Sequence, residues 1–204
     1  MTKLPFIDEV SSLESTTHIL SKSAKGKTSI LAAIAAELVK QDNKRIYFLT
    51  DDKTKLVLKK MVSYITGEGL SDLDTKETTN LQNKITSFVA NNSALTIKTL
   101  TNSVSFNDIV FDISSRIKND NINILILDIP LTHKLGELIN LIKANFNIQI
   151  FSSNFLSNRG SKLNLNNDNY VILNDDQKSI NIITSSGFYI SHSINICFSH
   201  LKFS

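Results

Sequence analysis

Apolar residues follow two patterns along the chain, short continuous runs and stripes with steps of three and four residues. Continuous runs predict strands buried on both faces of a sheet, and the stripes predict amphipathic helices. The predicted strands are His18–Leu20, Ile46–Leu49, Leu95–Ile97, Ile122–Asp128 and Ile148–Phe151. The predicted helices are Phe6–Leu13, Ser29–Lys40, Lys53–Ile65, Thr78–Ala90, Phe106–Ile117 and Lys134–Asn145.

Strands and helices alternate as far as Phe151. This alternation predicts an α/β fold with a mostly parallel sheet flanked by helices on both faces. Beyond Ser152 a polar segment precedes three apolar runs that are separated by turn residues. These runs predict strands at Tyr170–Leu173, Ile180–Thr184 and Phe188–Phe198, which form an antiparallel extension at the edge of the sheet. No internal repeat or domain boundary interrupts the pattern, so residues 1–204 are expected to form a single domain.

A small, basic loop joins the first predicted strand to the helix that follows it, and it ends in Gly26-Lys27-Thr28. In a phosphate-binding loop, backbone N–H groups and the helix N-terminus hold phosphate oxygens, the Lys reaches the β- and γ-phosphates, and the hydroxyl ligates Mg²⁺. The usual pattern is G-x-x-x-x-G-K-[ST], and Ser21 stands in place of the first Gly. A Gly-Lys-Thr sequence can also simply begin a helix. The predicted nucleotide-binding residues are Ser21, Ser23, Ala24, Lys25, Gly26, Lys27, Thr28 and Ser29.

Acidic residues follow two of the predicted strands, where ligands of parallel sheets bind. Asp128 ends the most apolar strand and is expected to hold Mg²⁺ opposite Thr28, the alternative being an ordinary turn residue. Asp51 and Asp52 follow another strand. A carboxylate there can orient an attacking water, whereas an Asp also suits an Asx turn or the N-cap of the helix predicted from Lys53. Both interpretations stay open for this pair.

Composition narrows the classes of protein that fit. The chain has 204 residues, of which 41% are apolar and 20% charged, and this suits one globular domain. A net charge of +3 is compatible with nucleic-acid binding. The single cysteine, Cys197, excludes an internal disulfide framework, and with His192 and His200 it matches structural zinc poorly. No run approaches the roughly 18–20 apolar residues of a membrane span, so we expect a cytoplasmic protein, or one in the host cytoplasm if viral.

In their order, these features resemble the ATPase domain of DnaB-type replicative helicases, including those of T4-like phages, within the RecA-like fold. The resemblance covers about Leu20 to Thr184 and is carried by four pieces of sequence. These are S-K-S-A-K-G-K-T; Y-F-L-T-D-D with Lys60 in the next helix; S-F-N-D-I-V; and I-L-I-L-D followed by I-Q-I-F-S-S-N and a basic Arg-Gly loop. The family commonly replaces the first Gly of the loop with another small residue, which accommodates Ser21.

The resemblance implies a RecA-like ATPase that uses ATP and Mg²⁺, acts on single-stranded DNA and assembles as a ring or filament of identical subunits. Replisome proteins are further possible partners, and a membrane is not. It also implies that Asp51 orients the attacking water and that Asn154, the nearest polar candidate, senses the γ-phosphate. Arg159 and Lys162 would contact DNA, the alternative being incidental charge on a solvated loop.

Two departures from the family weaken the expectation of fast hydrolysis in a ring. The catalytic Glu of the family is Asp51 here, and its basic C-terminal segment is replaced by Ile183–Gly187, which contains no Arg or Lys. Lys178 is therefore the candidate for a cation supplied to a neighbouring subunit. We also expect the family's primase-interacting N-terminal domain to be absent. We expect a helicase-type motor ATPase or, alternatively, a weakly hydrolysing or non-catalytic ATP-binding assembly or loading factor. A strand-exchange recombinase has no specific motif in its favour.

Overall fold

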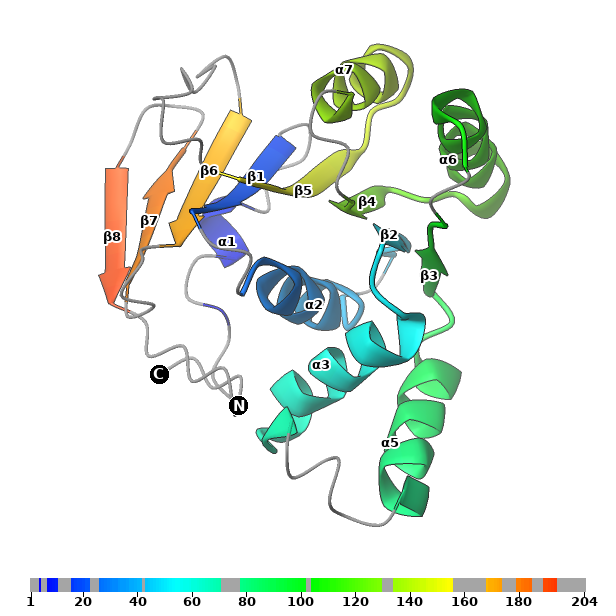
Figure 1. The fold of residues 1–204 in the computed structure, drawn as a ribbon, viewed down its shortest axis with the longest axis vertical. Coiled ribbons are helices and arrows are strands. Elements are labelled where there is room, and N and C mark those ends of the chain that lie inside the picture. Colours follow the sequence, from blue (N-terminus) through cyan, green and yellow to red (C-terminus); the bar gives the residue numbers. More distant parts are fainter. Residues whose placement is uncertain are drawn as a thin grey trace.

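An eight-stranded sheet forms the centre of the molecule, with helices on both faces (Figure 1). The strands lie in the order β3-β2-β4-β5-β1-β6-β7-β8. The computed structural model describes residues 4, 7–10, 16–22, 26–41, 43–70, 78–101, 104–129, 134–155, 168–173, 179–184 and 189–193. The predicted α/β fold with a mostly parallel sheet is confirmed.

The elements follow the predicted order, with most bounds shifted by a few residues. The strands are β1 (Thr16–Ser21), β2 (Ile46–Thr50), β3 (Leu95–Thr99), β4 (Ile124–Asp128), β5 (Gln149–Phe155), β6 (Asp168–Leu173), β7 (Ser179–Ile183) and β8 (Tyr189–Ser193). The helices are α1 (Ile7–Val10), α2 (Lys27–Leu38), α3 (Thr54–Thr66), α5 (Thr78–Asn91), α6 (Phe106–Asp120) and α7 (Leu135–Asn145).

Pairing from β3 through to β6 is parallel, and β7 and β8 complete the sheet in antiparallel pairs. The predicted antiparallel extension is therefore present in β6, β7 and β8, and β6 joins the rest of the sheet through parallel pairing with β1. Strand β5 lies between β4 and β1, so the strand that leads into the Gly-Lys-Thr loop and the strand that ends in Asp128 are not direct neighbours.

Each buried strand sends alternate side chains to two separate hydrophobic cores. Phe48 and Ile126 face the core that contains α1, α2 and α3, whereas Tyr47 and Leu125 face the core under α6 and α7. The helices accordingly lie on opposite sides of the sheet in Figure 1. Burial on both faces explains why these strands are almost entirely apolar, since each fully buried side chain of this kind contributes about 1.5–3 kcal/mol.

Helix α2 is enclosed between the sheet and the neighbouring helix α3. Its residues from Ile30 to Ala36 are all fully buried, so the helix has apolar or small side chains on every side. A helix held in this way gives its N-terminus a fixed position at the edge of the sheet. None of the helices in the described ranges is both long and apolar enough to cross a membrane.

Candidate functional site

The carboxyl ends of β1, β2, β4 and β5 meet at one edge of the sheet, because these strands are parallel. Leu20 pairs with Asn154 across β1 and β5, and Thr50 pairs with Asp128 across β2 and β4. The topology thus brings Ser21, Asp51, Asp128 and Asn154 to the same edge, as the sequence predicts. Ser23, Ala24, Lys25, Arg159, Lys162 and Lys178 lie outside the described residues.

Gly26 makes the turn from the loop into α2. Its φ of 94° and ψ of −24° lie in the left-handed region, which a residue with a side chain adopts only with strain. The carbonyl of Gly26 accepts the first helical hydrogen bond, from the N–H of Ile30 at 3.0 Å. The N–H groups of the first turn have no acceptor within the helix, and together with the helix dipole they form a site suited to an anion.

Lys27 begins α2 and is 5% exposed. Burial lowers the pKa of its ammonium group, because desolvation penalises the charged form, and the negative charge of Asp128 opposes this lowering. A buried ammonium beside a helix N-terminus places a second source of positive potential at the same edge. Ser21 and Ser29 are also buried there, and Thr28 is half-buried.

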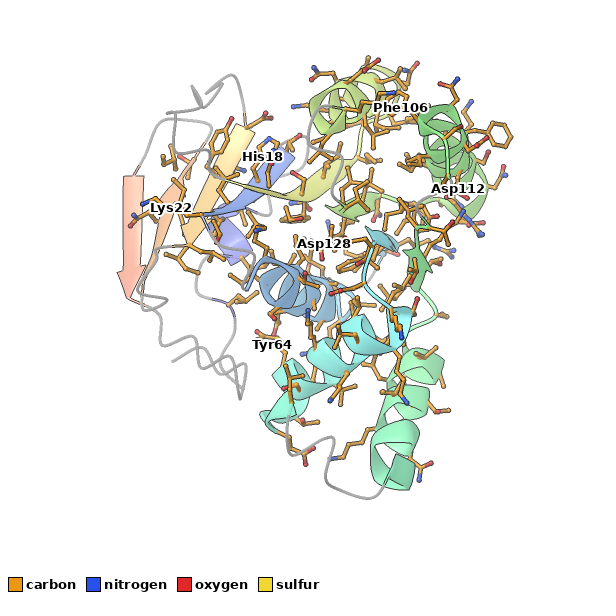
Figure 2. All side chains as sticks on the ribbon, viewed as in Figure 1. His18, Lys22, Tyr64, Phe106, Asp112 and Asp128 are labelled. Atoms are coloured by element: carbon orange, nitrogen blue, oxygen red, sulfur yellow. The ribbon has the colours of Figure 1, made fainter. Side chains whose placement is uncertain are left out.

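Asp128 is 6% exposed at the end of β4, and Figure 2 shows it between α2 and the strands. Its Oδ1 accepts a hydrogen bond from the Ser153 hydroxyl at 2.6 Å, whereas its Oδ2 is buried and makes no hydrogen bond of normal geometry among the described residues, although the Thr28 hydroxyl lies near enough to favour the ionised carboxylate. Burial raises the pKa of the Asp128 carboxyl, and the hydroxyls of Ser153 and Thr28 oppose that rise. The negative charge of Asp51 raises this pKa further, and the positive charge of Lys60 lowers it.

The orphaned oxygen of Asp128 tests whether Mg²⁺ fits the site. An acceptor left unsatisfied in the interior costs about 1–3 kcal/mol, and a cation or a water bound to a cation removes that cost. Mg²⁺ prefers oxygen ligands and is usually held by one or two protein groups together with phosphates and waters. Thr28 and Asp128 supply a hydroxyl and a carboxylate, so the residues present fit this ion.

Asp51 and Asp52 differ in their surroundings, although they are adjacent. The N–H of Asp51 donates to the carbonyl of Asp128 at 3.2 Å, and the Asp51 side chain is exposed. The carboxylate of Asp52 instead forms an ion pair with Lys60 at 3.3 Å. Its carbonyl accepts from the Thr99 hydroxyl at 2.9 Å. The alternative in which one of these acids caps the following helix is wrong, because Lys53 occupies the N-cap position of α3.

The sequence places Ser152–Asn154 at the ligand-binding edge of the sheet, but it did not predict the contact between Ser153 and Asp128. The apolar run ends at Phe151, so the prediction ended the strand there, but pairing with β1 continues β5 as far as Phe155. Ser153 is therefore directed to the same face as Phe151, the face covered by α2, and it contacts Asp128. A small polar residue two positions after a buried apolar one was the available signal. Asn154 follows it, half-buried at the edge of the sheet.

A second polar cluster lies on the opposite face of the sheet, around His18 in β1 (Figure 2). The His18 ring lies 2.8 Å from the Ser152 hydroxyl and 3.3 Å from the Asp168 carboxylate, which also accepts from Lys143 at 2.9 Å. Burial alone would raise the pKa of Asp168, but His18 and Lys143 together lower it. Ser152 is 0% exposed, so this Ser–His–Asp arrangement offers no accessible nucleophile and is structural.

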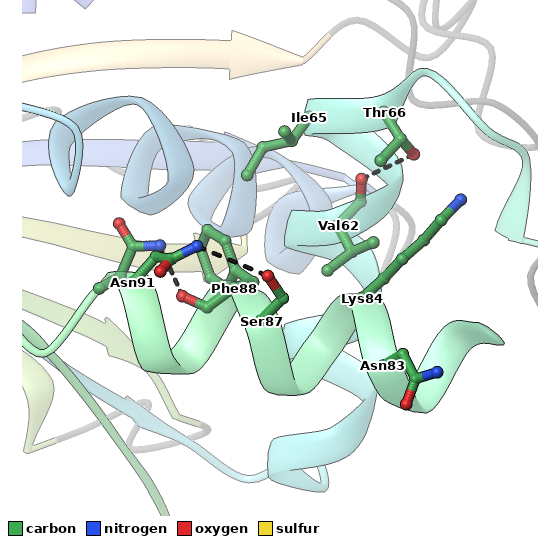
Figure 3. Close-up of a pocket in the computed structure, with 9 residues that line it drawn as sticks. Val62, Ile65, Thr66, Asn83, Lys84, Ser87, Phe88 and Asn91 are labelled. Atoms are coloured by element: carbon green, nitrogen blue, oxygen red, sulfur yellow. Dashed lines mark hydrogen bonds between the residues drawn. The ribbon is translucent and has the colours of Figure 1, made fainter. Parts of the chain in front are cut away.

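A groove of about 420 Å³ separates α3 from α5 and is drawn in Figure 3. Val62 and Phe88 contribute to its apolar lining, and Lys84 lies at one side. The groove involves the C-terminal half of α3, whereas the N-terminus of α3 lies at the edge that carries Asp51 and Asp128. It is therefore separate from the candidate site.

Within the described part of the chain, no group of three or more His, Cys, Asp or Glu side chains forms a metal centre made by protein ligands alone. No protein-family model matches the chain, and no curated protein matches it either.

Proposed function

We propose that this protein is a RecA-like P-loop ATPase that binds ATP with Mg²⁺ and acts as a helicase-type motor on single-stranded DNA. The observation that carries the nucleotide site is the orphaned buried Oδ2 of Asp128, which lies in the same site as Lys27 and Thr28. A buried carboxylate and a buried ammonium group at a helix N-terminus suit a divalent cation and an anion held together.

In this proposal each residue has a separate task. Bound ATP and Mg²⁺ supply the phosphoanhydride and the Lewis acid. Lys27 and the first N–H groups of α2 bind phosphate oxygens, while Thr28 and Asp128 hold the cation. Asp51 is exposed beside Asp128 and accepts a hydrogen bond from the attacking water, which orients it. Asn154 lies at the end of the adjacent strand β5 and senses the terminal phosphate.

The helicase assignment rests on the resemblance to DnaB-type ATPase domains. This assignment predicts a homo-oligomeric ring or filament, DNA contacts through Arg159 and Lys162, and association with replisome proteins. Lys178 would supply the cation to a neighbouring subunit, a task that contributes about 10³–10⁵ in rate in other nucleotide hydrolases. Lys178→Ala should then reduce turnover without changing nucleotide affinity.

A second candidate, an ATP-binding assembly or loading factor with slow hydrolysis, is favoured by one observation. The acid best placed to orient water is Asp51, because its side chain is exposed and its backbone N–H contacts the carbonyl of Asp128. An aspartate reaches one methylene less far than the glutamate of the resembled family. Slow turnover that single-stranded DNA does not stimulate would support this second candidate.

Calorimetry with ATP and Mg²⁺ tests the nucleotide site directly. Lys27→Ala should weaken ATP binding at least tenfold, because it removes a charge-assisted contact. A tenfold change in affinity corresponds to about 1.4 kcal/mol. Lys118→Ala is the matched control, because Lys118 is an exposed lysine in the last turn of α6, which precedes the start of β4 and so lies away from the edge that carries Asp128. If the wild-type protein binds neither ATP nor GTP in the presence of Mg²⁺, the proposal is wrong.

A further inference from the structure

Lys60 lies in the second turn of α3, and its side chain is only 14% exposed. Side chains on a helix lean toward its N-terminus, so the long stem of Lys60 runs back toward the edge of the sheet where α3 begins. Its ammonium group lies 3.3 Å from the Asp52 carboxylate. The lysine therefore reaches the edge that carries the candidate site from a helix that the proposed function does not use.

The charge of Lys60 acts on the site as well as on Asp52. Its field stabilises the ionised form of Asp128, in opposition to the field of Asp51. Among the described residues, the carboxylates of Asp51, Asp52 and Asp128 and the buried or half-buried ammonium groups of Lys27 and Lys60 lie at this edge, and the exposed Lys22 follows the end of β1. A triphosphate with one Mg²⁺ brings further negative charge to the site. It would therefore attract the ammonium group of Lys60 if that group can leave Asp52.

The ion pair between Lys60 and Asp52 can be exchanged at little cost. The Asp52 side chain is 35% exposed, and water can solvate its carboxylate once the lysine leaves. The Lys60–Asp52 contact is itself a hydrogen bond, but at 3.3 Å it is longer than the roughly 2.7–2.9 Å of strong charge-assisted bonds, and a terminal phosphate carries more negative charge than one carboxylate. The balance favours a phosphate oxygen over Asp52 as the partner of Lys60.

We propose that Lys60 binds the terminal phosphate of a nucleoside triphosphate and is held by Asp52 when that phosphate is absent. Lys60 would then distinguish triphosphate from diphosphate within one subunit, and it would supply a cation from the same chain that carries the loop. The proposal rests on the proposed nucleotide site and adds Lys60 to it as the residue that binds the γ-phosphate.

Calorimetry with Mg²⁺ and either ADP or a non-hydrolysable ATP analogue tests this role without depending on turnover. Lys60→Ala should weaken binding of the analogue about tenfold, which corresponds to a loss of ~1.4 kcal/mol, and change ADP affinity less than about twofold. Lys55→Ala is the matched control, since Lys55 is an exposed lysine in the same helix. It should change neither affinity.

Asp52→Asn provides an independent test that keeps Lys60 in place. Removing the competing carboxylate should strengthen binding of the analogue by about twofold to fivefold, since the pair it breaks contributes only about 0–1 kcal/mol. Equal losses of both nucleotides in Lys60→Ala, or no loss of either, would overturn the inference while leaving the nucleotide site intact. Failure of the wild-type protein to bind either nucleotide would overturn both proposals. If Lys60→Ala does not fold, the Asp52→Asn result decides.

Discussion

Replacing Asp128 with Asn should stabilise the nucleotide-free protein while weakening its binding of nucleotide and Mg²⁺. The substitution keeps an oxygen that can accept the Ser153 hydrogen bond at the position of Oδ1 and removes the buried charge. Asp128 is 6% exposed, and its other oxygen has no hydrogen-bond partner among the described residues. The hydroxyls of Ser153 and Thr28 and the charge of Lys60 favour the ionised carboxylate, but they do not offset the effect of burial.

The sign of the effect follows from the pKa. The pKa of Asp128 is raised above the model-compound value of 3.8, with burial as the main cause. A raised pKa in the folded state means that folding favours the protonated form. The contribution of Asp128 to stability is therefore fully present below pH 3.8 and is lost as the pH rises through the folded-state pKa. Asn has no charge, so Asp128→Asn should gain stability over the wild-type protein across that interval.

The expected gain at pH 7 is about 1–3 kcal/mol, because an unsatisfied buried charge costs more than the unsatisfied amide N–H₂ group that Asn places at the Oδ2 position, and a neutral group of that kind costs about 1–3 kcal/mol. The gain should lie at the lower end of this range if Lys27 is destabilised, because the negative charge of Asp128 stabilises the charged form of the Lys27 ammonium group. For a chain of this size, each kcal/mol raises Tm by about 2–4 °C. Glu137→Gln is the control, because Glu137 is an exposed acid in the first turn of α7 and should give no gain.

Thermal unfolding of the nucleotide-free protein between pH 4 and 8 measures the effect, and calorimetry with ATP and Mg²⁺ measures the loss of binding. The difference between the variant and the wild-type protein should be small at pH 4 and should grow toward pH 7. A variant that is less stable than the wild-type protein at pH 7, with a parallel pH profile, would refute the claim that burial of the Asp128 charge outweighs the groups that stabilise it.

Three further outcomes test other parts of the molecule. Gly26→Ala should lower the free energy of unfolding by about 1–2 kcal/mol, because the φ of 94° at this position is left-handed. The variant should also bind ATP more weakly. Thermal unfolding measures the first effect and calorimetry the second. Asp168→Asn should lower the free energy of unfolding by about 1–3 kcal/mol at pH 7. The pKa of Asp168 is lowered in the folded state, so its ionised form adds stability above pH 3.8 that is lost as the pH falls through the folded-state pKa. In acid unfolding, the difference in stability between the variant and the wild-type protein should therefore disappear. Replacing both Arg159 and Lys162 with Ala should weaken single-stranded DNA binding and lower the salt slope by at most about two units, and an unchanged slope and affinity would assign this loop to solvent.

The sequence alone was enough to predict the fold class and the place of the candidate site. Continuous apolar runs and helical stripes are local signals, and in a parallel sheet covered on both faces they alternate clearly. Gly26-Lys27-Thr28 and Asp128 could be placed at strand ends for the same reason. The DNA contacts at Arg159 and Lys162 and the cation at Lys178 stay predictions, since these residues lie outside the described ranges.

Only the tertiary structure determined which polar groups contact one another. Insertion of β5 between β4 and β1 depends on long-range packing and on the connections between elements, and it brings Ser153 to Asp128. The different roles of Asp51 and Asp52 depend on where α3 places the ammonium group of Lys60. Hydrophobic periodicity reports which face of an element is buried. It does not report which neighbour covers that face, because this is decided by the order of the strands and by the side chains that meet across them.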